Sequence, residues 1–347
     1  MIQQSRRRVF FWKRVGTVTL LSLTLQSCSL LRLPLVQSPK PDPSFELTSA
    51  AGVDYAPLQT LLKRQRWQDA DQETFRALLK MSNRETEGWL DQTSVETLSC
   101  TDLHTLAKAW DYYSDSRFGF IRQQQIWEEL GGVVGNYTPQ TAEQFGDRVG
   151  WRKKGEWLTY DQLNFSSRAS EGHLPATTGN GVSGGVWGGV PAITYRLKYC
   201  QLADALAQRQ WVKADWETLT LFDAYRAPED NEPEPAPLIH EDIPCHELKA
   251  VEQLWLKASK GRFGLSVQRD ILKKTGNLPG ELHWRRYEEF EKAVGWAIDV
   301  REDTYNGADP QTIPAGHFPY RLGYSYVTYG SGFDRTWRLS LNPSCGY

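Results

Sequence analysis

Apolar residues along this chain recur mostly at intervals of three and four, the spacing that places side chains on one face of an α-helix. The first half carries three such sets, namely Leu58, Leu61 and Leu62, then Phe75, Leu78 and Leu79, then Leu103, Leu106, Ala107 and Trp110. The second half carries Leu202, Ala205 and Leu206, then Leu248, Val251, Leu254 and Trp255. Thr101 is a suitable N-cap for a helix that begins at Asp102. Alternation typical of strands is confined to 193–197 and 324–341, so the pattern predicts a mainly α protein with long loops.

The two halves are copies of one another. Residues that match at a separation of 144 or 145 positions include Trp67 and Trp211, Asp71 and Asp215, Trp110 and Trp255, Trp151 and Trp296, and His173 and His317. A period of this length is the size of a domain and much longer than a solenoid repeat. We therefore expect two tandem helical domains, at 56–200 and 201–347, and the 14 tryptophans of the chain can supply both cores.

The first residues have the layout of a signal peptide, here assigned to residues 1–27. Five basic residues precede or flank the start of an apolar run from Val15 to Leu25, which is short for a transmembrane helix. The following Leu-Gln-Ser-Cys resembles a lipobox, which predicts lipidation of Cys28 and a proline-rich tether over 28–55. An ordinary cleaved signal and an uncleaved anchor are the alternatives, and Arg7-Arg8 leaves twin-arginine export open. The expected location is outside the cytoplasm, lipid-anchored at the periplasmic or lumenal face of a membrane.

Removal of residues 1–27 makes the chain more acidic than the full sequence, whose net charge is −2. Of the 40 basic residues, 5 lie in that segment, so 40 − 5 = 35 remain against 42 acidic residues, a net charge of −7. A domain of this sign is poorly suited to bind nucleic acid or an anionic membrane surface through charge. We therefore expect no nucleic-acid partner and membrane contact only through the lipid anchor.

The remaining four cysteines obey the repeat. Cys100 corresponds to Cys245 and Cys200 to Cys345, each at a separation of 145. An even, repeat-related number of thiols in an exported chain favours one disulfide in each domain, Cys100–Cys200 and Cys245–Cys345. Reduced buried thiols and the other pairings remain the alternatives.

Several sequence motifs resemble catalytic or ligand-binding motifs but lack the neighbouring elements that such sites need. The Gly-rich stretch 178–190 matches a dinucleotide fingerprint and a nucleophile elbow in form, but no apolar strand precedes it and no good helix follows. The acidic, proline-rich stretch 227–237 is typical of a surface loop. None of the six histidines shows a two-His helix spacing with a nearby carboxylate, and the four cysteines are assigned to disulfides, so we predict no metal site. The carboxylates at Asp71 and Asp215 are better explained as helix support than as acid/base groups, and no catalytic residue is predicted.

Five motifs recur in order through Leu58–Pro175 and again through Leu202–Pro319. They are Trp-x-x-Ala-Asp-x-x-Thr, Cys-x-Asp/Glu-Leu, Trp-x-x-x-Ser-x-x-Arg-Phe-Gly-Phe/Leu-x-x-Gln, Val-Gly-Trp and Gly-His-x-Pro. In this order they resemble the porphyrin-binding family called "genomes uncoupled four". The resemblance implies a helical domain that binds protoporphyrin or Mg-protoporphyrin non-covalently, without catalysis, and assists magnesium chelatase in chlorophyll synthesis.

A porphyrin is a large apolar plane with two propionates, so its receptor needs aromatic and aliphatic walls and a few cations at the rim. The tetrapyrrole-binding residues that we expect on this basis are Arg117, Phe118, Phe120, Trp151, Phe165 and Leu174 in the first repeat and Arg262, Phe263, Leu265, Trp296 and Phe318 in the second. The phenylalanines have an alternative role in the core. His173 and His317 are open to two interpretations, contact with a bound metal or a hydrogen bond that fixes a loop.

Neither repeat keeps the whole family pattern. The first retains the stretch Leu163–Pro175, whereas the second has lost the aromatic and aliphatic residues there and keeps Phe-Gly-Leu-Ser-Val-Gln instead. We therefore expect one repeat to bind and the other to support it. Export argues against magnesium chelatase as a partner, which leaves capture or buffering of porphyrin as the expected function. The alternative is an envelope protein-interaction module that has kept the fold and lost the ligand.

Overall fold

A computed structural model describes residues 46–176, 189–225, 243–276, 284–296 and 302–320, together with Cys345. Outside the described residues lie the predicted signal peptide, Cys28, the acidic stretch 227–237, the alternating stretch 324–341 and all of 178–190 except its last two residues. Within the described part of the chain, no helix combines the length and the apolar character that a membrane crossing needs.

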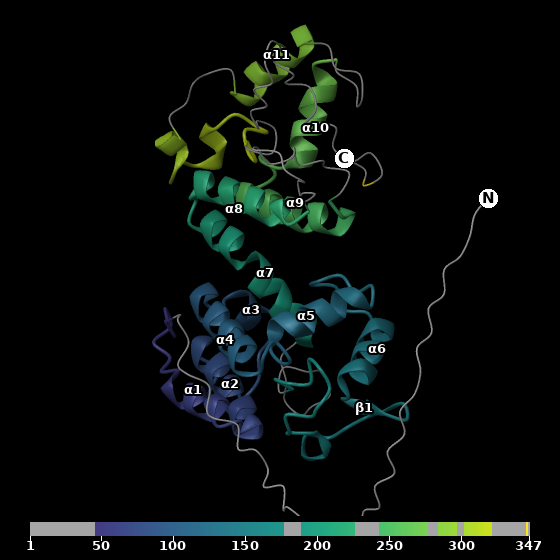
Figure 1. The fold of residues 1–347 in the computed structure, drawn as a ribbon. Helices are drawn as coiled ribbons and strands as arrows, with labels where there is room; N and C mark the ends of the chain where they lie inside the picture. The colour runs from purple at the N-terminus through teal and green to yellow at the C-terminus, as the bar shows by residue number, and fades with distance from the viewer. Residues whose placement is uncertain are drawn as a thin grey trace, which may run out of the picture. The chain divides into compact units, whose positions relative to one another are not determined.

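The described chain is mainly helical, which confirms the predicted fold class (Figure 1). The elements of the first repeat are α1 (Ala56–Lys63), α2 (Trp67–Met81), α3 (Gln92–Glu96), α4 (Cys100–Tyr113), α5 (Phe120–Glu129), α6 (Pro139–Val149), β1 (Arg152–Lys153), β2 (Glu156–Trp157) and the 3-10 turn η1 (Tyr160–Gln162). After α7 (Gly189–Ala207) come α8 (Trp211–Asp223), α9 (Cys245–Ser259), α10 (Leu265–Lys274), α11 (Trp284–Val294), η3 (Glu302–Tyr305) and η4 (Pro310–Thr312).

The helices of the two repeats correspond in order. Helices α2, α4, α5 and α6 of the first repeat have α8, α9, α10 and α11 as their counterparts in the second. Within the first repeat, α1 packs on α2 and α4, and α5 packs on α4 and α6 (Figure 1). The 144–145 residue period therefore reproduces the same order of helices as well as the same sequence motifs.

Helix α7 joins the repeats and corrects one prediction. The stretch 193–197, whose alternation suggested a strand, lies inside this helix. The reason is that apolar residues continue at helical spacing through Val190, Ile193 and Leu197, all of which are buried, and that Pro191 stands in the first turn, where a proline fits a helix. Helix α7 contacts α3, α4 and α5 of the first repeat and α8 and α9 of the second. Because further buried residues lie on its other faces, the helix has no separate polar stripe.

The start of α4 corrects a second prediction. Ser99, not Thr101, is the N-cap, because Ser99 has extended backbone dihedrals and its hydroxyl accepts a hydrogen bond from the amide of Asp102. The helix consequently begins at Cys100, two residues before the predicted start. Helix α6 begins in the same way, with Thr138 as the cap and Pro139 in its first turn.

Each repeat has a tryptophan pair at its centre. The rings of Trp67 and Trp110 stack with centroids 6.1 Å apart, and Phe118 meets Trp67 edge-on at 5.3 Å. Trp211 and Trp255 repeat the stack at 6.3 Å, and Phe263 meets Trp211 edge-on at 5.3 Å. In both repeats the second indole donates to a threonine of the preceding long helix, at 2.9 and 3.0 Å, so these buried polar atoms are satisfied.

The end of the predicted tether is attached to the first repeat. Asp102 on α4 accepts hydrogen bonds from the hydroxyl of Ser49, from the amides of Ala50 and Ala51, and from the hydroxyl of Tyr55. These bonds hold the pKa of the Asp102 carboxyl below its ordinary value, despite its burial. Residues 49–55 therefore pack on α4, and only residues 28–45 of the predicted tether lie outside the described chain.

Candidate functional site

The recurring motifs converge on one loop in each repeat. In the first repeat this loop runs from Gly150 to Ala176, after α6; its counterpart, of which 295–296 and 302–320 are described, follows α11. In each repeat the Gly-His-x-Pro motif near the end of the loop is held by residues of the Arg-Phe-Gly segment and of the helix that follows it. The site is therefore best described by the contacts that fix this loop.

A glutamine at the start of α5 and of α10 holds the end of the loop. Nε2 of Gln123 donates to the carbonyls of Gly172 and Pro175, at 3.0 and 2.9 Å. Gln268 makes the same pair of bonds, to Gly316 at 2.9 Å and Pro319 at 2.8 Å. Both glutamines are buried. Their hydrogen bonds therefore satisfy loop carbonyls that water does not reach.

The glycine of each Arg-Phe-Gly segment is required by its conformation. Gly119 has φ of +107° and Gly264 has φ of +141°, values that side chains disfavour. The Gly119 amide donates to the carbonyl of Leu174 at 2.8 Å, and a Cβ on Gly119 would lie 2.8 Å from the Cβ of Trp110. The Gly264 amide bonds to Phe318 in the same way, at 3.0 Å. These glycines let the loop lie directly against the start of the helix.

The two predicted rim arginines also hold the loop. Nε and Nη2 of Arg117 donate to the carbonyl of Ala169, at 2.9 and 2.6 Å. Nη2 of Arg262 donates to the carbonyl of Ile313, its counterpart, at 2.5 Å. Both side chains are half-buried. In this structure the guanidinium groups therefore position backbone, and their contact with a propionate stays a prediction.

Most of the predicted wall residues lie inside the cores. Phe118, Phe120, Trp151, Leu174, Phe263, Leu265, Trp296 and Phe318 are all buried. Each indole of the Val-Gly-Trp motif donates to the carbonyl of a loop histidine, Trp151 to His173 at 2.7 Å and Trp296 to His317 at 2.8 Å. The structure thus gives these residues the core-packing role that was the alternative for the phenylalanines. Their direct contact with a ligand stays a prediction.

The loop histidines make the loop-fixing hydrogen bond that was one of their two interpretations. Nδ1 of His173 donates to the carbonyl of Val149 at 2.6 Å, and its Nε2 accepts from the amide of Asn164 at 3.1 Å. Nδ1 of His317 donates to the carbonyl of Val294 at 2.8 Å. Burial lowers the pKa of both imidazoles below the ordinary value, so they are neutral. Because both ring nitrogens of His173 are engaged by backbone, a metal ligand role there would break the loop contacts.

Phe165 is the predicted wall residue that remains half-buried, and it has an aromatic neighbour that the sequence reasoning missed. The rings of Phe165 and Tyr160 lie 5.0 Å apart. The Tyr160 hydroxyl donates to Asp71 of α2 at 2.8 Å, and the other Asp71 oxygen accepts from the amide of Ala176 at 2.6 Å. Burial and the carboxylate raise the pKa of the Tyr160 hydroxyl, so it stays protonated. Asp71 thus supports the loop, whereas the sequence had suggested support of its own helix.

A short hairpin presents another aromatic side chain that the prediction omitted. Strands β1 and β2 pair through a two-residue turn at Lys154 and Gly155, both with positive φ, which matches the twist of the hairpin. Trp157, on β2, is 37% exposed, and the Arg152 guanidinium lies over its ring at 5.4 Å. Leu158 follows and is half-buried. Glu156 separates the Lys-Gly turn from Trp157 and Leu158, so no run of apolar residues marked this hairpin in the sequence.

We refer to Trp157, Leu158, Tyr160, Phe165 and Arg168 as the loop surface of the first repeat. Its four apolar members are half-buried or exposed, and Arg168 is exposed. Among the described residues, the Arg168 guanidinium makes no hydrogen bond or ion pair that would compete for an anion. The surface therefore combines partly exposed rings with an accessible cation on one loop.

The second repeat lacks such a surface in its described part. By the repeat spacing, Asp309 stands where the first repeat has Phe165, and it is exposed. Tyr305 is half-buried and turns to its own core, with its ring 4.7 Å from that of His317 and 6.2 Å from that of Phe318. The two repeats therefore share the scaffold that fixes the loop and differ in the side chains that the loop offers to solvent.

Both disulfides favoured by the repeat spacing are present. One joins Cys100 at the start of α4 to Cys200 in α7, and the other joins Cys245 at the start of α9 to Cys345. Each closes a sequence separation of 100 residues. The same cross-link thus recurs at the same place in the two repeats.

Taken together, fold and site define a tandem helical protein in which each repeat clamps a long loop against its helices. The sequence profile of the GUN4-like family matches residues 48–187 and again residues 193–327. The chain belongs to the GUN4-like family and carries two copies of its domain.

Proteins with related sequences support this assignment. The Ycf53-like protein of Synechocystis sp. is 31% identical over 134 residues, which are 38% of this chain and 54% of that protein. The chloroplastic tetrapyrrole-binding protein of Arabidopsis thaliana is 32% identical over 132 residues, 35% of this chain and 47% of that protein. This chain thus spans about half the length of these relatives.

Two solved structures also match part of this chain. GUN4 from Chlamydomonas reinhardtii is 27% identical, and the match covers 44% of this chain and 94% of that one with a TM-score of 0.35. The ligand-free structure of Arabidopsis thaliana GUN4 is 26% identical, covering 36% of this chain and 84% of that one with a TM-score of 0.31.

Proposed function

We propose that this chain is a non-catalytic tetrapyrrole-binding protein that takes up protoporphyrin or its magnesium derivative. The observation that carries the proposal is the GUN4-like match over both repeats, together with a relative that is named as a tetrapyrrole-binding protein. The site described above adds a physical reason, because it presents rings and a cation on a loop that is fixed from several sides.

The loop surface of the first repeat is the proposed contact. A porphyrin plane gains affinity from aromatic and aliphatic side chains that are still partly in water, because only these lose further apolar exposure on binding. Tyr160 and Phe165 meet this condition, whereas the fully buried Phe118 and Trp151 do not. Arg168 is suited to a propionate, since a guanidinium binds a carboxylate through two parallel hydrogen bonds.

The second repeat is proposed to support the first without a site of its own. Asp309, in the place of Phe165, presents an exposed carboxylate. A carboxylate offers no apolar contact to the porphyrin plane and repels its negative propionates. The prediction that one repeat binds while the other supports it thus becomes specific, with the first as the binding repeat.

The compartment shapes the biological role that we propose. With the signal peptide at 1–27 and lipidation at Cys28, the protein would capture or buffer porphyrin at the periplasmic or lumenal face of a membrane. Regulation of chlorophyll synthesis through magnesium chelatase would require contact with an enzyme on the opposite side. We therefore favour the capture role, which the two disulfides of the chain suit.

A titration of the oxidised full chain tests this function. Protoporphyrin and its magnesium derivative are added while tryptophan quenching and the porphyrin absorption band are followed. The Phe165→Ala variant should weaken saturable binding about tenfold, in line with the loss of one large apolar contact. Tyr305→Ala in the second repeat is the matched control and should leave the affinity unchanged. Absence of saturable binding to the folded chain would contradict the proposal and leave an envelope interaction module.

A further inference from the structure

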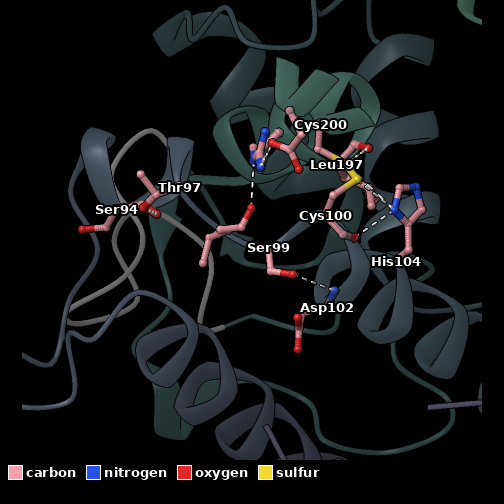
Figure 2. A network of polar contacts seen from close by, with 11 residues as sticks. Ser94, Thr97, Ser99, Cys100, Asp102, His104, Leu197 and Cys200 are labelled. Atoms are coloured by element: carbon pink, nitrogen blue, oxygen red, sulfur yellow. Dashed lines mark hydrogen bonds and ion pairs between the residues drawn. A yellow bond between two sulfur atoms is a disulfide. The ribbon is translucent and has the colours of Figure 1, made fainter. Parts of the chain in front are cut away.

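A cluster of two cysteines and one histidine lies at the junction of α4 and α7, away from the loop surface. Cys100 begins α4, His104 stands one turn later on the same helix, and Cys200 belongs to α7. Figure 2 shows the imidazole facing the two sulfurs, with Nδ1 of His104 lying 3.5 Å from Sγ of Cys100 and 3.9 Å from Sγ of Cys200. All three ligand atoms lie within 4.8 Å of one another.

In the oxidised structure these sulfurs are bonded to each other and are not available to a metal. A dithiol reductant would change this, since it transfers two electrons and two protons to the Cys100–Cys200 bond and itself becomes a disulfide. The two thiols would stay close together because other contacts also fix α4 and α7. Nε of Arg196, on α7, donates to the carbonyl of Leu98 at 2.9 Å, just before α4, and Ser99 caps that helix.

The distances fit a tetrahedral zinc ion. With Zn–S near 2.3 Å and Zn–N near 2.0–2.1 Å, tetrahedral geometry places sulfur and nitrogen about 3.5 Å apart and the two sulfurs about 3.8 Å apart. The sulfur–nitrogen distances of the cluster already lie close to this value. Only the two sulfurs must separate, which is what cleavage of the disulfide permits.

We propose that reduction of the Cys100–Cys200 disulfide creates a zinc site with Cys100, Cys200 and His104 as ligands. Binding releases both thiol protons, because thiolates are the ligands. Nδ1 of His104 now donates to the carbonyl of Cys100 at 2.9 Å, so the ring must move its proton to Nε2 and give up this bond. Cys100 and His104 are half-buried, which leaves a fourth position open to water.

The second repeat provides a natural contrast. Lys249 stands at the position of His104, and an ammonium group is not a metal ligand. His246, next to Cys245, points elsewhere, with its Nε2 lying 3.3 Å from a carboxylate oxygen of Glu247. Among the described residues, no histidine or carboxylate joins Cys245 and Cys345 in a cluster like that of Cys100, His104 and Cys200. One zinc per reduced chain is therefore expected.

This site is separate from the proposed tetrapyrrole contact, and it departs from the prediction from sequence, which has no metal site. That prediction assigned all four cysteines to disulfides, which holds only for the oxidised state. The same two sulfurs thus form a cross-link in an oxidising compartment and a metal site in a reducing one.

The test uses the full chain, reduced by a phosphine, which takes its oxygen from water and leaves two thiols. After anaerobic removal of the phosphine, zinc is added and its affinity is measured by competition with a chromophoric chelator, while far-UV circular dichroism reports folding. We expect one zinc in the reduced chain and none in the oxidised chain. Loss of a direct ligand should cost at least as much as loss of a supporting residue, so His104→Lys should weaken zinc binding tenfold or more.

A double variant, Cys245→Ala with Cys345→Ala, is the control and should bind zinc as the wild type does. The proposal is overturned if the reduced chain binds no zinc, if His104→Lys binds it equally well, or if the control loses the zinc. It is also overturned if the reduced chain unfolds and zinc does not restore its helices.

Discussion

Gln123 on α5 donates hydrogen bonds from one amide nitrogen to the carbonyls of Gly172 and Pro175, and so holds the loop of the first repeat at both ends of its Gly-His-Leu-Pro motif. Gln268 does the same for the second repeat. Because the two repeats share this clamp and differ in the loop surface, paired substitutions can separate the role of the scaffold from that of the ligand contacts.

The first prediction concerns this clamp. Gln123→Ala leaves two carbonyls without a donor in a buried place, which costs about 2–4 kcal/mol of unfolding free energy. Gln268→Ala should cost a similar amount, and urea unfolding followed by circular dichroism measures both. Porphyrin affinity should fall only with Gln123→Ala, because its loop carries the proposed contacts. A fall in both variants would show that the second repeat also binds.

The second prediction separates charge from positioning at Arg117. Both Nε and Nη2 of this residue bond to the carbonyl of Ala169, which a lysine ammonium cannot reproduce with the same fork geometry. We therefore expect Arg117→Lys to weaken porphyrin binding nearly as much as Arg117→Ala, by several-fold. The titration described above measures both variants, and Arg262→Lys is the control. If Arg117→Lys binds like the wild type, the positive charge itself is the important feature.

Sequence was sufficient for the duplication and the helical fold, and it favoured the cysteine pairing over its alternatives, because each depends on spacing. It failed where the partner of a side chain is a backbone group far along the chain. Arg117 looked like a free rim cation, yet the carbonyl of Ala169 that it binds is displayed by a loop with no residue-specific signal. The stretch 193–197 looked like a strand because a helix that is buried on most faces loses its polar stripe.

The solvent exposure of individual aromatic side chains also could not be predicted from the sequence. Phe118 and Phe165 are chemically alike, but only the second keeps contact with solvent, since Phe118 is packed against Trp67. Trp157 was omitted because nothing in its neighbours indicated that a two-residue turn would raise it to the surface. Such side chains are selected by tertiary packing, which the order of residues does not display directly.

The third prediction concerns the cross-links. Each disulfide spans 100 residues of sequence, and a loop of that length is expected to stabilise the folded state by about 3–5 kcal/mol through restriction of the unfolded chain. Cys100→Ala with Cys200→Ala should lower the free energy of unfolding by this amount, and Cys245→Ala with Cys345→Ala should do so similarly. Urea unfolding under oxidising conditions measures the loss. An unchanged midpoint would show that the unfolded chain is already restricted.

The fourth prediction is a loss of stability on acidification that arises from the loop histidines. Burial lowers the pKa of His173 and His317 in the folded state, below the value of about 6.5 expected for the unfolded chain. As the pH falls below 6.5, both histidines become protonated in the unfolded chain but stay neutral in the folded chain. The free energy of unfolding therefore decreases until the pH reaches the pKa of the folded state. The full contribution is therefore present above pH 6.5. Urea unfolding of the wild type and of the double variant His173→Asn with His317→Asn, measured from pH 7.5 to 5, should show a smaller decline in the variant. An equal decline in both proteins would assign the pH dependence to other groups.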